Sequence, residues 1–214
     1  MSKTHLHTYW IGGSPCSGKT TIAGRLASSY GCDVYRCDEA FFRHQGLIVP
    51  EAQPIFHRLS NATCDELWMR PVATQVSEEL ALYREEFPFI VDDLAGSRGT
   101  YARIVEGAAL LPELLAGHGV ERRSAIWIVP TEHFQRERYA QRAWRHDVLA
   151  GCTDKEQAWN NWMERDASFA RFVAREAQVR GFRALTVDGT QSLEETLRTV
   201  ETWFGLERSH GEPS

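Results

Sequence analysis

The sequence has little cysteine, and its five cysteines follow no pattern typical of a metal site or a disulfide framework. No C-x-x-C pair occurs, the count is odd, and the positions are scattered, namely Cys16, Cys32, Cys37, Cys64 and Cys152. Disulfide-rich and zinc-binding folds need paired cysteines at characteristic spacings. We therefore expect neither a disulfide framework nor a zinc site, and we expect a reducing, cytoplasmic compartment.

Other absences exclude further classes of protein. No apolar run approaches the length of a membrane span, and residues 1–7 lack the apolar core of a signal peptide. Basic residues are not in excess, because 24 Lys and Arg against 29 Asp and Glu give a net charge of −5. This balance argues against a nucleic-acid partner. No repeat or Gly/Ser linker interrupts the 214 residues. We expect one domain over 1–206 and a frayed polar tail over 207–214.

The segment Gly13–Thr20 reads GSPCSGKT and matches the phosphate-binding pattern G-x-x-x-x-G-K-[ST] at every position. A β-prone segment precedes it, and a helical segment ending at Gly31 follows it. Backbone N–H groups in such a loop bind phosphate, while the Lys reaches the terminal phosphates and the Thr hydroxyl binds Mg²⁺. The expected nucleotide-binding residues are Gly13, Ser14, Pro15, Cys16, Ser17, Gly18, Lys19, Thr20 and Thr21. We interpret Cys16 as a passive loop residue, although a helix start can lower a thiol pKa.

Short β-prone runs alternate with helical patterns along the chain, which is typical of a parallel sheet covered by helices. Ligands of such sheets bind beyond the carboxyl ends of the strands. The chain is therefore predicted to be an α/β protein. Its expected strands are 8–11, 33–37, 103–105, 125–129 and 184–187.

Two segments, 89–93 and 103–107, both resemble strands ending in acidic residues, yet they lie too close in sequence for a parallel crossover. Apolar residues recur every three or four positions through the first segment, so we predict a helix over 74–94 and assign the strand to 104–106. Asp92 and Asp93 are then expected to be solvated or loop-facing. A second amphipathic helix is predicted over 155–180, with Trp159 and Trp162 on its packing face.

Two carboxylates follow predicted strands on the side where the phosphate loop lies. Asp38 is a candidate general base for an acceptor hydroxyl, with Glu39 in reserve; the structural alternative is a turn acid that caps the next helix. Glu106 is a candidate second acid that holds a water on Mg²⁺, and a structural role is an equal alternative. Gly107 would let the backbone pass close to the site.

Two further regions are candidates for closing the site. Arg138, Arg142 and Arg145 are spaced to share one helix face, and with Arg136 they suggest a lid over 131–153 that neutralises a transferring phosphoryl group. A solvated basic face is the alternative. Residues 40–73 are rich in aromatic and basic residues and are broken by proline, which suggests an acceptor-binding insert; a packed structural cap is the alternative.

With these motifs, the sequence resembles the small P-loop kinases of the nucleoside and nucleotide kinase type. These include shikimate, gluconate and adenylate kinases and chloramphenicol phosphotransferase. The resemblance implies a three-layer fold with strand order 2-3-1-4-5, helices on both faces, a helical acceptor-binding insert, an arginine-rich lid, ATP with Mg²⁺, and Asp38 as base. It also implies that the turn around Asp188 passes near adenine. Shikimate and gluconate kinases carry D-x-D at the second strand, whereas here Arg36 replaces the first acid.

These observations predict an ATP- and Mg²⁺-dependent kinase that phosphorylates a hydroxyl of a small molecule, such as a metabolite, nucleoside or antibiotic. The expected catalytic residues are Lys19, Asp38, Arg138 and Arg142, with Thr20 and Glu106 on the metal side. One alternative is a nucleoside monophosphate kinase with Arg43, Arg58 and Arg70 around the acceptor phosphate. Another is a nucleotide-gated regulatory ATPase. A polynucleotide 5′-kinase is disfavoured by the net charge. The partners expected are a small-molecule acceptor, with no nucleic acid and no membrane.

Overall fold

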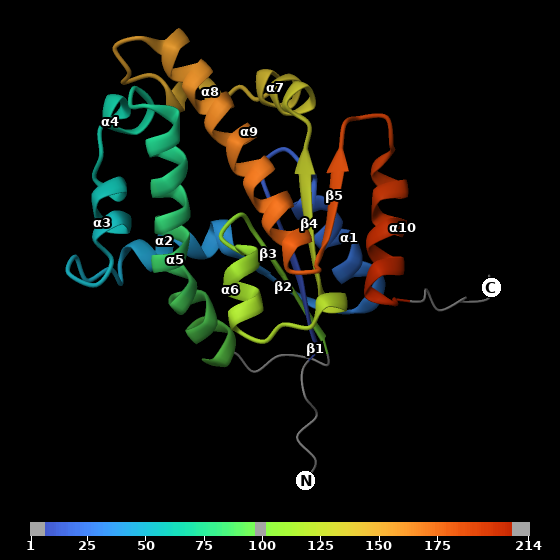
Figure 1. Cartoon of the computed structure of the whole chain (residues 1–214). Helices are drawn as coiled ribbons and strands as arrows, with labels where there is room; N and C mark the ends of the chain where they lie inside the picture. Colours follow the sequence, from blue (N-terminus) through green and yellow to red (C-terminus); the bar gives the residue numbers. More distant parts are fainter. Residues whose placement is uncertain (1–6, 97–101, 207–214) are drawn as a thin grey trace.

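A computed structural model describes residues 7–96 and 102–206, so the expected tail over 207–214 lies outside the described residues. Five parallel strands form one sheet in the order β2-β3-β1-β4-β5, as predicted. Each predicted strand has its counterpart (Figure 1). The strands are β1 His7–Gly13, β2 Asp33–Arg36, β3 Ala102–Glu106, β4 Ala125–Pro130 and β5 Arg183–Val187.

Helices connect and cover the strands. Among the described residues they are α1 Lys19–Tyr30, α2 Cys37–Gln45, α3 Pro54–Ser60, α4 Cys64–Trp68, α5 Val72–Gly96, α6 Pro112–Gly117, α7 Glu132–Ala140, α8 Arg145–Val148, α9 Lys155–Val179 and α10 Leu193–Phe204, with a 3₁₀ turn η1 over Arg122–Ser124. None of these helices is long and apolar enough to cross a membrane.

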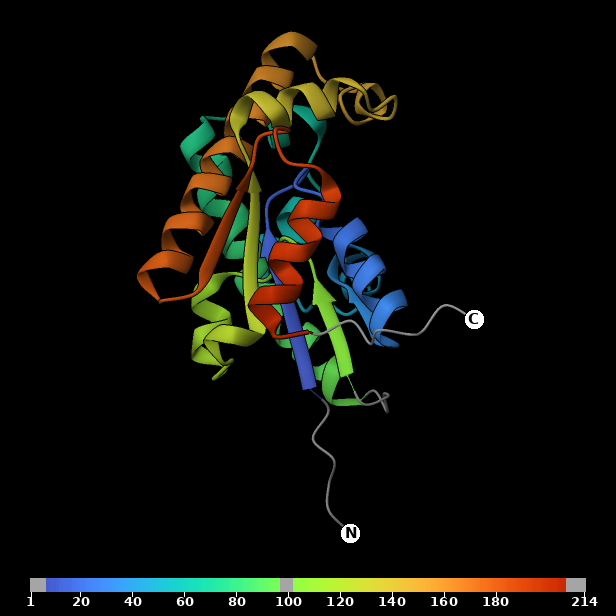
Figure 2. The same ribbon diagram turned by 90° about the vertical axis from the view of Figure 1, so that its right-hand side faces the viewer.

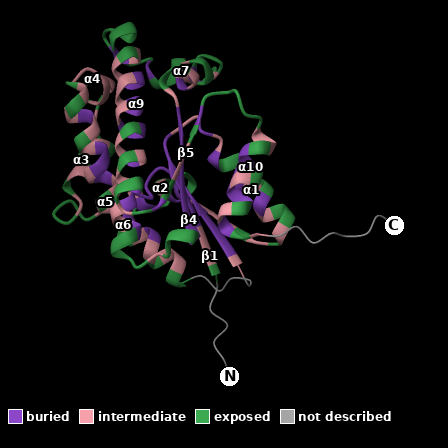
Figure 3. Cartoon of the chain, turned by 45° about the vertical axis from the view of Figure 1, so that its right-hand side comes forward, coloured by how far each residue is buried: buried purple, intermediate pink, exposed green. Residues whose placement is uncertain are grey.

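The sheet has a separate apolar core on each face. Along β4, Ile126 and Ile128 pack under α1 and α10, whereas Trp127 and Val129 point to the opposite face under α5 and α9. This alternation is what period-2 side-chain direction in a strand requires. Figure 2 shows α1 and α10 on one side of the sheet and α9 on the other, and Figure 3 shows the buried strands between them.

The helix predicted over 74–94 is confirmed as α5, which runs through Pro88. Its two consecutive acids behave differently. Asp92 is exposed, as expected, but Asp93 is half-buried and not simply solvated. The Asp93 carboxylate accepts hydrogen bonds from Tyr35 Oη at 2.6 Å and Arg43 Nη2 at 2.8 Å. That prediction was wrong for Asp93 because its side of α5 faces β2 and α2.

A third apolar cluster lies where the insert, the lid region and the first half of α9 meet. Trp162 is buried there and Trp159 packs against it, so the prediction that these tryptophans belong to a packing face is confirmed. Within this cluster Cys64 and Cys152 form a disulfide, and their Cα atoms are 4.9 Å apart. This single disulfide was not expected from the scattered cysteines, of which Cys16, Cys32 and Cys37 are free. A sequence separation of 88 residues gives no sign of this tertiary contact.

Candidate active site

The loop between β1 and α1 requires glycine at its first position. Gly13 has φ +125°, and a Cβ there would lie 1.9 Å from the Ile128 carbonyl oxygen of the neighbouring strand. Gly18 has φ +85°, a left-handed conformation that glycine adopts without strain. Cys16, with φ +65°, is the one described non-glycine residue with positive φ. The backbone is thus folded tightly at the helix start, as a phosphate-binding loop requires.

Lys19 lies inside this loop, where it is only 8% exposed. Its Nζ donates to the Ser14 carbonyl oxygen at 2.7 Å, which holds the ammonium group under the loop. Burial lowers the pKa of Lys19, whereas the nearby Asp38 and Glu106 carboxylates act to raise it. Burial also raises the pKa of the Cys16 thiol to about 11, so this cysteine is protonated at neutral pH and fits the passive role expected.

A cavity of about 720 Å³ opens over the phosphate loop, and we call it the donor cavity. Gly13 and Ser14 belong to the loop but do not line this cavity. The Ser14 and Ser17 hydroxyls are buried and have no hydrogen-bond partner among the described residues. The loop and the lid region supply much of the lining, which is Pro15, Cys16, Ser17, Gly18, Lys19, Thr20, Thr21, Asp38, Ala108, Phe134, Arg138, Gln141, Arg142, Val187, Gly189, Gln191, Ser192, Leu193 and Thr196.

Two of the four candidate arginines line the donor cavity. The Arg138 guanidinium lies over the Phe134 ring at 4.7 Å, and that of Arg142 over the Tyr139 ring at 5.1 Å. Neither makes an ion pair within residues 7–96 and 102–206, so both keep their charge available for an anion. The prediction that Arg138, Arg142 and Arg145 share one helix face was wrong. The reason is that α7 ends at Ala140, Arg142 lies in the connection between the helices, and Arg145 begins α8.

The turn after β5 borders the donor cavity. Val187 and Gly189 line the cavity, whereas the predicted Asp188 does not. The Asp188 carboxylate instead accepts hydrogen bonds from the Thr190 backbone N–H at 2.9 Å and the Thr190 hydroxyl at 2.6 Å. These two bonds lower the pKa of Asp188 and fix the turn. The side chain of Asp188 therefore shapes the nucleotide side without facing it.

Glu106 ends β3, paired in register with Ile11 on one side and Arg36 on the other. Its carboxylate lies beside the Thr20 side chain, and its Oε2 is buried with no partner among the described residues. Burial raises the pKa of Glu106, opposed by the charge of Lys19. Next to it, a Cβ on Gly107 would lie 2.4 Å from Cys37 Cβ, so glycine there lets α2 start against the end of β3.

Asp38 is the second residue of α2, because β2 ends at Arg36 and Cys37 is already helical. The side chain of Asp38 does not cap the helix, since the N-cap is Arg36 with no side-chain cap bond. Asp38 is exposed and lines the donor cavity together with Pro15 and Ala108. The same three residues also line a second cavity of about 540 Å³, which we call the acceptor cavity. Asp38 therefore stands at the junction of the two cavities.

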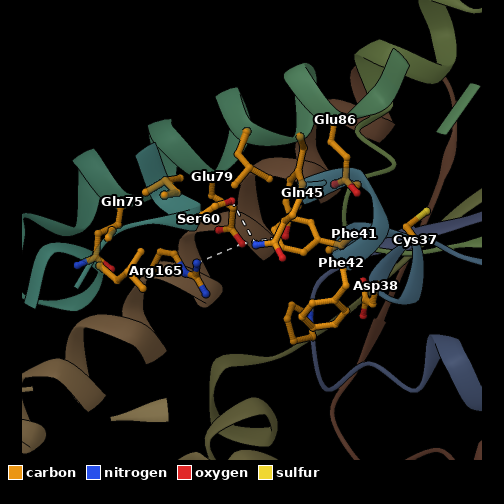
Figure 4. A pocket seen from close by; sticks show the side chains of 18 of the residues that line it. Cys37, Asp38, Phe41, Phe42, Gln45, Ser60, Gln75, Glu79, Glu86 and Arg165 are labelled. Atoms are coloured by element: carbon orange, nitrogen blue, oxygen red, sulfur yellow. Dashed lines mark hydrogen bonds and ion pairs between the residues drawn. The ribbon is translucent and has the colours of Figure 1, made fainter. Parts of the chain in front are cut away.

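The acceptor cavity extends from Asp38 between α2, the insert and α5 (Figure 4). Asp38 and Phe42 lie toward one end in that view, whereas Gln75 and Arg165 lie toward the other. Within the insert, Trp68 and Arg70 line the cavity, whereas Phe56 is fully buried and acts as a packed cap. The lining was only partly predicted: Gln75, Glu79, Glu86 and Arg165 were missed. Polar residues at 75, 79 and 86 interrupt the apolar pattern of α5, and this was the available signal.

A buried network behind the acceptor cavity fixes α2 against α5. His44 Nδ1 lies 3.0 Å from Glu86 Oε1, and its Nε2 lies 3.1 Å from Asp93 Oδ2. His44 and Glu86 are each 1% exposed. Burial raises the pKa of Glu86 to about 7, although the hydrogen bond from His44 acts to lower it. These contacts tie the helix that carries Asp38 to the helix that lines the cavity.

The insert arginines proposed for an acceptor phosphate are already paired with carboxylates. Arg43 pairs with Asp93 at 2.8 Å, and both Arg58 and Arg70 pair with Glu78. Of the three, only Arg70 lines the acceptor cavity. The structure thus leaves little uncompensated positive charge at the wall where a phosphorylated acceptor would bind.

Comparison with known proteins identifies the fold. No protein-family model and no curated protein sequence matches the chain. Among solved structures, TT1252 from Thermus thermophilus is similar with a TM-score of 0.52 and 19% identity, over 94% of this chain and 97% of that one. The deoxyadenosine kinase from M. mycoides with bound dATP is similar with a TM-score of 0.50 and 10% identity, over 93% and 99%. Together with the sheet order and the phosphate loop, these similarities show that the chain has the fold of the P-loop nucleotide kinases.

Proposed function

We propose that the protein is an ATP- and Mg²⁺-dependent kinase that transfers the γ-phosphate to a hydroxyl group of a small molecule. The observation that carries this proposal is the position of Asp38 in the lining of both cavities. A hydroxyl bound beside Asp38 faces the loop that contains Lys19, so acceptor and phosphate meet at one carboxylate. The fold shared with a deoxyadenosine kinase supports the kinase class and leaves the acceptor open.

Asp38 accepts the hydroxyl proton while the acceptor oxygen bonds to the γ-phosphorus. The bond from that phosphorus to the bridging oxygen breaks, and ADP leaves. Lys19, Arg138 and Arg142 line the donor cavity, where their charges would neutralise the charge that spreads over the oxygens of the transferred group.

The residues near Lys19 are suited to Mg²⁺. Among the described residues no cluster of three or more His, Cys, Asp or Glu forms a metal cage. Mg²⁺ is commonly held by one or two protein groups together with substrate phosphates and waters. The exposed Thr20 would bind it directly and Glu106, whose Oε2 lacks a partner, through water. When bound, the ion neutralises charge on the β- and γ-phosphates.

The two alternatives have less support. A nucleoside monophosphate kinase needs positive charge for the acceptor phosphate, and Arg43, Arg58 and Arg70 are paired with carboxylates. A regulatory ATPase needs no second pocket, whereas a 540 Å³ cavity adjoins the phosphate loop at Asp38. Both features favour transfer to an unphosphorylated small molecule.

ADP release in the presence of a panel of hydroxylated small molecules tests the proposal. We expect Asp38→Asn to lower acceptor-stimulated turnover by about 10²- to 10⁴-fold, the usual worth of a general base, with the Kd for ATP changed less than threefold. Lys19→Ala should weaken both ATP binding and transfer. Glu39, the reserve candidate, lines neither cavity and pairs with Arg36, so Glu39→Gln is the matched control and should keep full activity. Undiminished transfer by the Asp38→Asn protein would contradict the proposal.

A further inference from the structure

The inner part of the acceptor cavity contains two buried hydrogen-bond acceptors without donors. Gln75 is 4% exposed and Glu79 is 8% exposed, and both line the cavity. Gln75 Oε1 and Glu79 Oε2 have no hydrogen-bond partner among the described residues. Buried polar atoms in folded proteins are nearly always satisfied, so exceptions in a cavity wall point to a missing ligand. A ligand that donates hydrogen bonds would satisfy both oxygens.

The remaining atoms of these side chains are already engaged. Gln75 Nε2 donates to the Trp68 carbonyl oxygen at 3.2 Å and to that of Arg70 at 2.8 Å, which fixes the amide so that its oxygen stays free. Glu79 Oε1 accepts from Tyr83 Oη at 3.1 Å. Both side chains are therefore arranged as acceptors.

The charges around Glu79 are unbalanced. Arg165 pairs with two carboxylates, Asp166 and Glu79, and it lies nearer Asp166, where Nε to Oδ1 is 2.8 Å. Its Nη1 is 3.4 Å from Glu79 Oε1. One guanidinium thus serves two buried carboxylates, which leaves one negative charge uncompensated when both are ionised. Burial raises the pKa of Glu79 to about 7, consistent with a carboxylate that lacks a full counter-charge.

The positions of Gln75 and Glu79 relative to Asp38 indicate a ligand with a polar group at each end. Gln75, Glu79 and Glu86 follow one another along one face of α5, and Figure 4 shows them over the cavity, with Asp38 toward the end away from Gln75. Gln75 and Glu79 are separated by four residues, about 6 Å along a helix. One ligand group at Asp38 and a second group at Glu79 would belong to the same small molecule.

We infer that the acceptor is a hydroxylated amine, whose hydroxyl lies at Asp38 and whose protonated amino group donates to Glu79 and Gln75. The ammonium group supplies the missing positive charge and the missing donors together. Amino alcohols, aminosugars and aminocyclitols have this chemistry. The hydroxyl half of the inference rests on the proposed kinase function, whereas the amine half rests on the binding groups alone.

Two measurements separate these halves. Binding is measured by calorimetry with amino alcohols, aminosugars and aminocyclitols, each beside its N-acetyl or deamino counterpart, and with nucleosides as neutral N–H donors. Transfer is measured as ADP release with the same panel. We expect amines to bind, and we expect N-acetylation to weaken binding at least 30-fold. Glu79→Gln should weaken amine binding about 30- to 100-fold and bring it close to that of the neutral counterpart. Asp92→Asn, exposed on the same helix, is the control and should leave binding unchanged.

The outcomes are distinct. Glu79-dependent amine binding without ADP release supports the amine site and contradicts the proposed kinase function. Preferential binding of neutral sugars or nucleosides, or amine binding that Glu79→Gln leaves unchanged, overturns the inference while the kinase function stands if ADP is released. Failure of every amine to bind also overturns it.

Discussion

The donor and acceptor cavities share Asp38 but are built in different ways. On the donor side, the phosphate loop is a single run of residues with a tightly folded backbone, in which Gly13 is required by Ile128 backbone atoms 1.9–2.8 Å from an added Cβ and Gly18 by its φ of +85°. On the acceptor side, side chains from α2, the insert, α5 and α9 meet only through tertiary packing. The donor side therefore depends on local backbone geometry, and the acceptor side depends on how separate helices are held together.

The strongest test of this contrast is Gly13→Ala. A methyl group there would lie 1.9 Å from the Ile128 carbonyl oxygen, and the φ of +125° is unfavourable for alanine. We expect at least about 3 kcal/mol of destabilisation and a large loss of ATP affinity. Thermal unfolding and nucleotide binding measure the two effects.

Gly24→Ala provides the matched control on α1. An added Cβ at Gly24 meets no atom within 4 Å, so helix propensity alone should stabilise the protein by about 0.5–1 kcal/mol. Equal behaviour of the two variants would show that the loop does not need its glycine conformation.

Loss of the disulfide should affect the acceptor side more than the donor side. The disulfide between Cys64 and Cys152 joins α4 to the segment that follows α8. Cys64→Ser with Cys152→Ser should cost about 2–4 kcal/mol of unfolding free energy and raise the KM for the acceptor more than that for ATP. Unfolding with and without reductant, followed by kinetics for both substrates, measures this. An equal rise in the KM for ATP and the KM for the acceptor would contradict the contrast between the donor and acceptor cavities.

These differences explain what could be predicted from the sequence. The loop from Gly13 to Thr20 was readable because its function lies in consecutive residues. The strand that ends at Glu106 was predicted because the helical spacing through Ile90 and Val91 excluded the competing strand, and β3 confirms it, with Glu106 beside Thr20. The sheet order followed from the resemblance to P-loop kinases and was confirmed.

The acceptor side was only partly readable because its contacts join distant segments. Arg165 lies on a helix with an ordinary amphipathic pattern, and nothing local shows that it pairs with Glu79. Cys64 and Cys152 likewise became partners through packing on α9. Of the arginines predicted to form a lid, Arg138 and Arg142 line the donor cavity, but the end of α7 at Ala140 separates Arg145 from Arg138.

The two lid arginines should contribute moderately to the donor side. Arg138 and Arg142 lie over aromatic rings and make no ion pair with described residues, so their charge remains available to phosphate. We expect Arg138→Ala and Arg142→Ala each to lower kcat by about 10- to 100-fold. Arg136→Ala, which breaks a 3.3 Å surface pair with Glu132, should change kcat less than twofold. If Arg136→Ala lowered kcat more than Arg138→Ala and Arg142→Ala do, Arg136 rather than those two residues would be the arginine that acts on the phosphate.

The smallest expected effect is a pH dependence of stability from Glu79, whose buried neighbours are Arg165, Asp166 and Tyr83. Burial raises its folded pKa to about 7, above the ordinary value of about 4.5, so below pH 4.5 the carboxyl is protonated in both states. As pH rises toward 7, the unfolded chain releases this proton first, so the free energy of unfolding falls across this range. Glu79→Gln should therefore gain stability relative to wild type between pH 5 and pH 8, as measured by urea unfolding.

Asp92→Asn should keep the wild-type dependence of stability on pH. The pKa of Glu86 is raised in the same direction as that of Glu79, so Glu86 should preserve part of this dependence in the Glu79→Gln protein. If Glu79→Gln kept the full slope, the Arg165 charge would be sufficient for both carboxylates, and the acceptor side would need no cation to complete it.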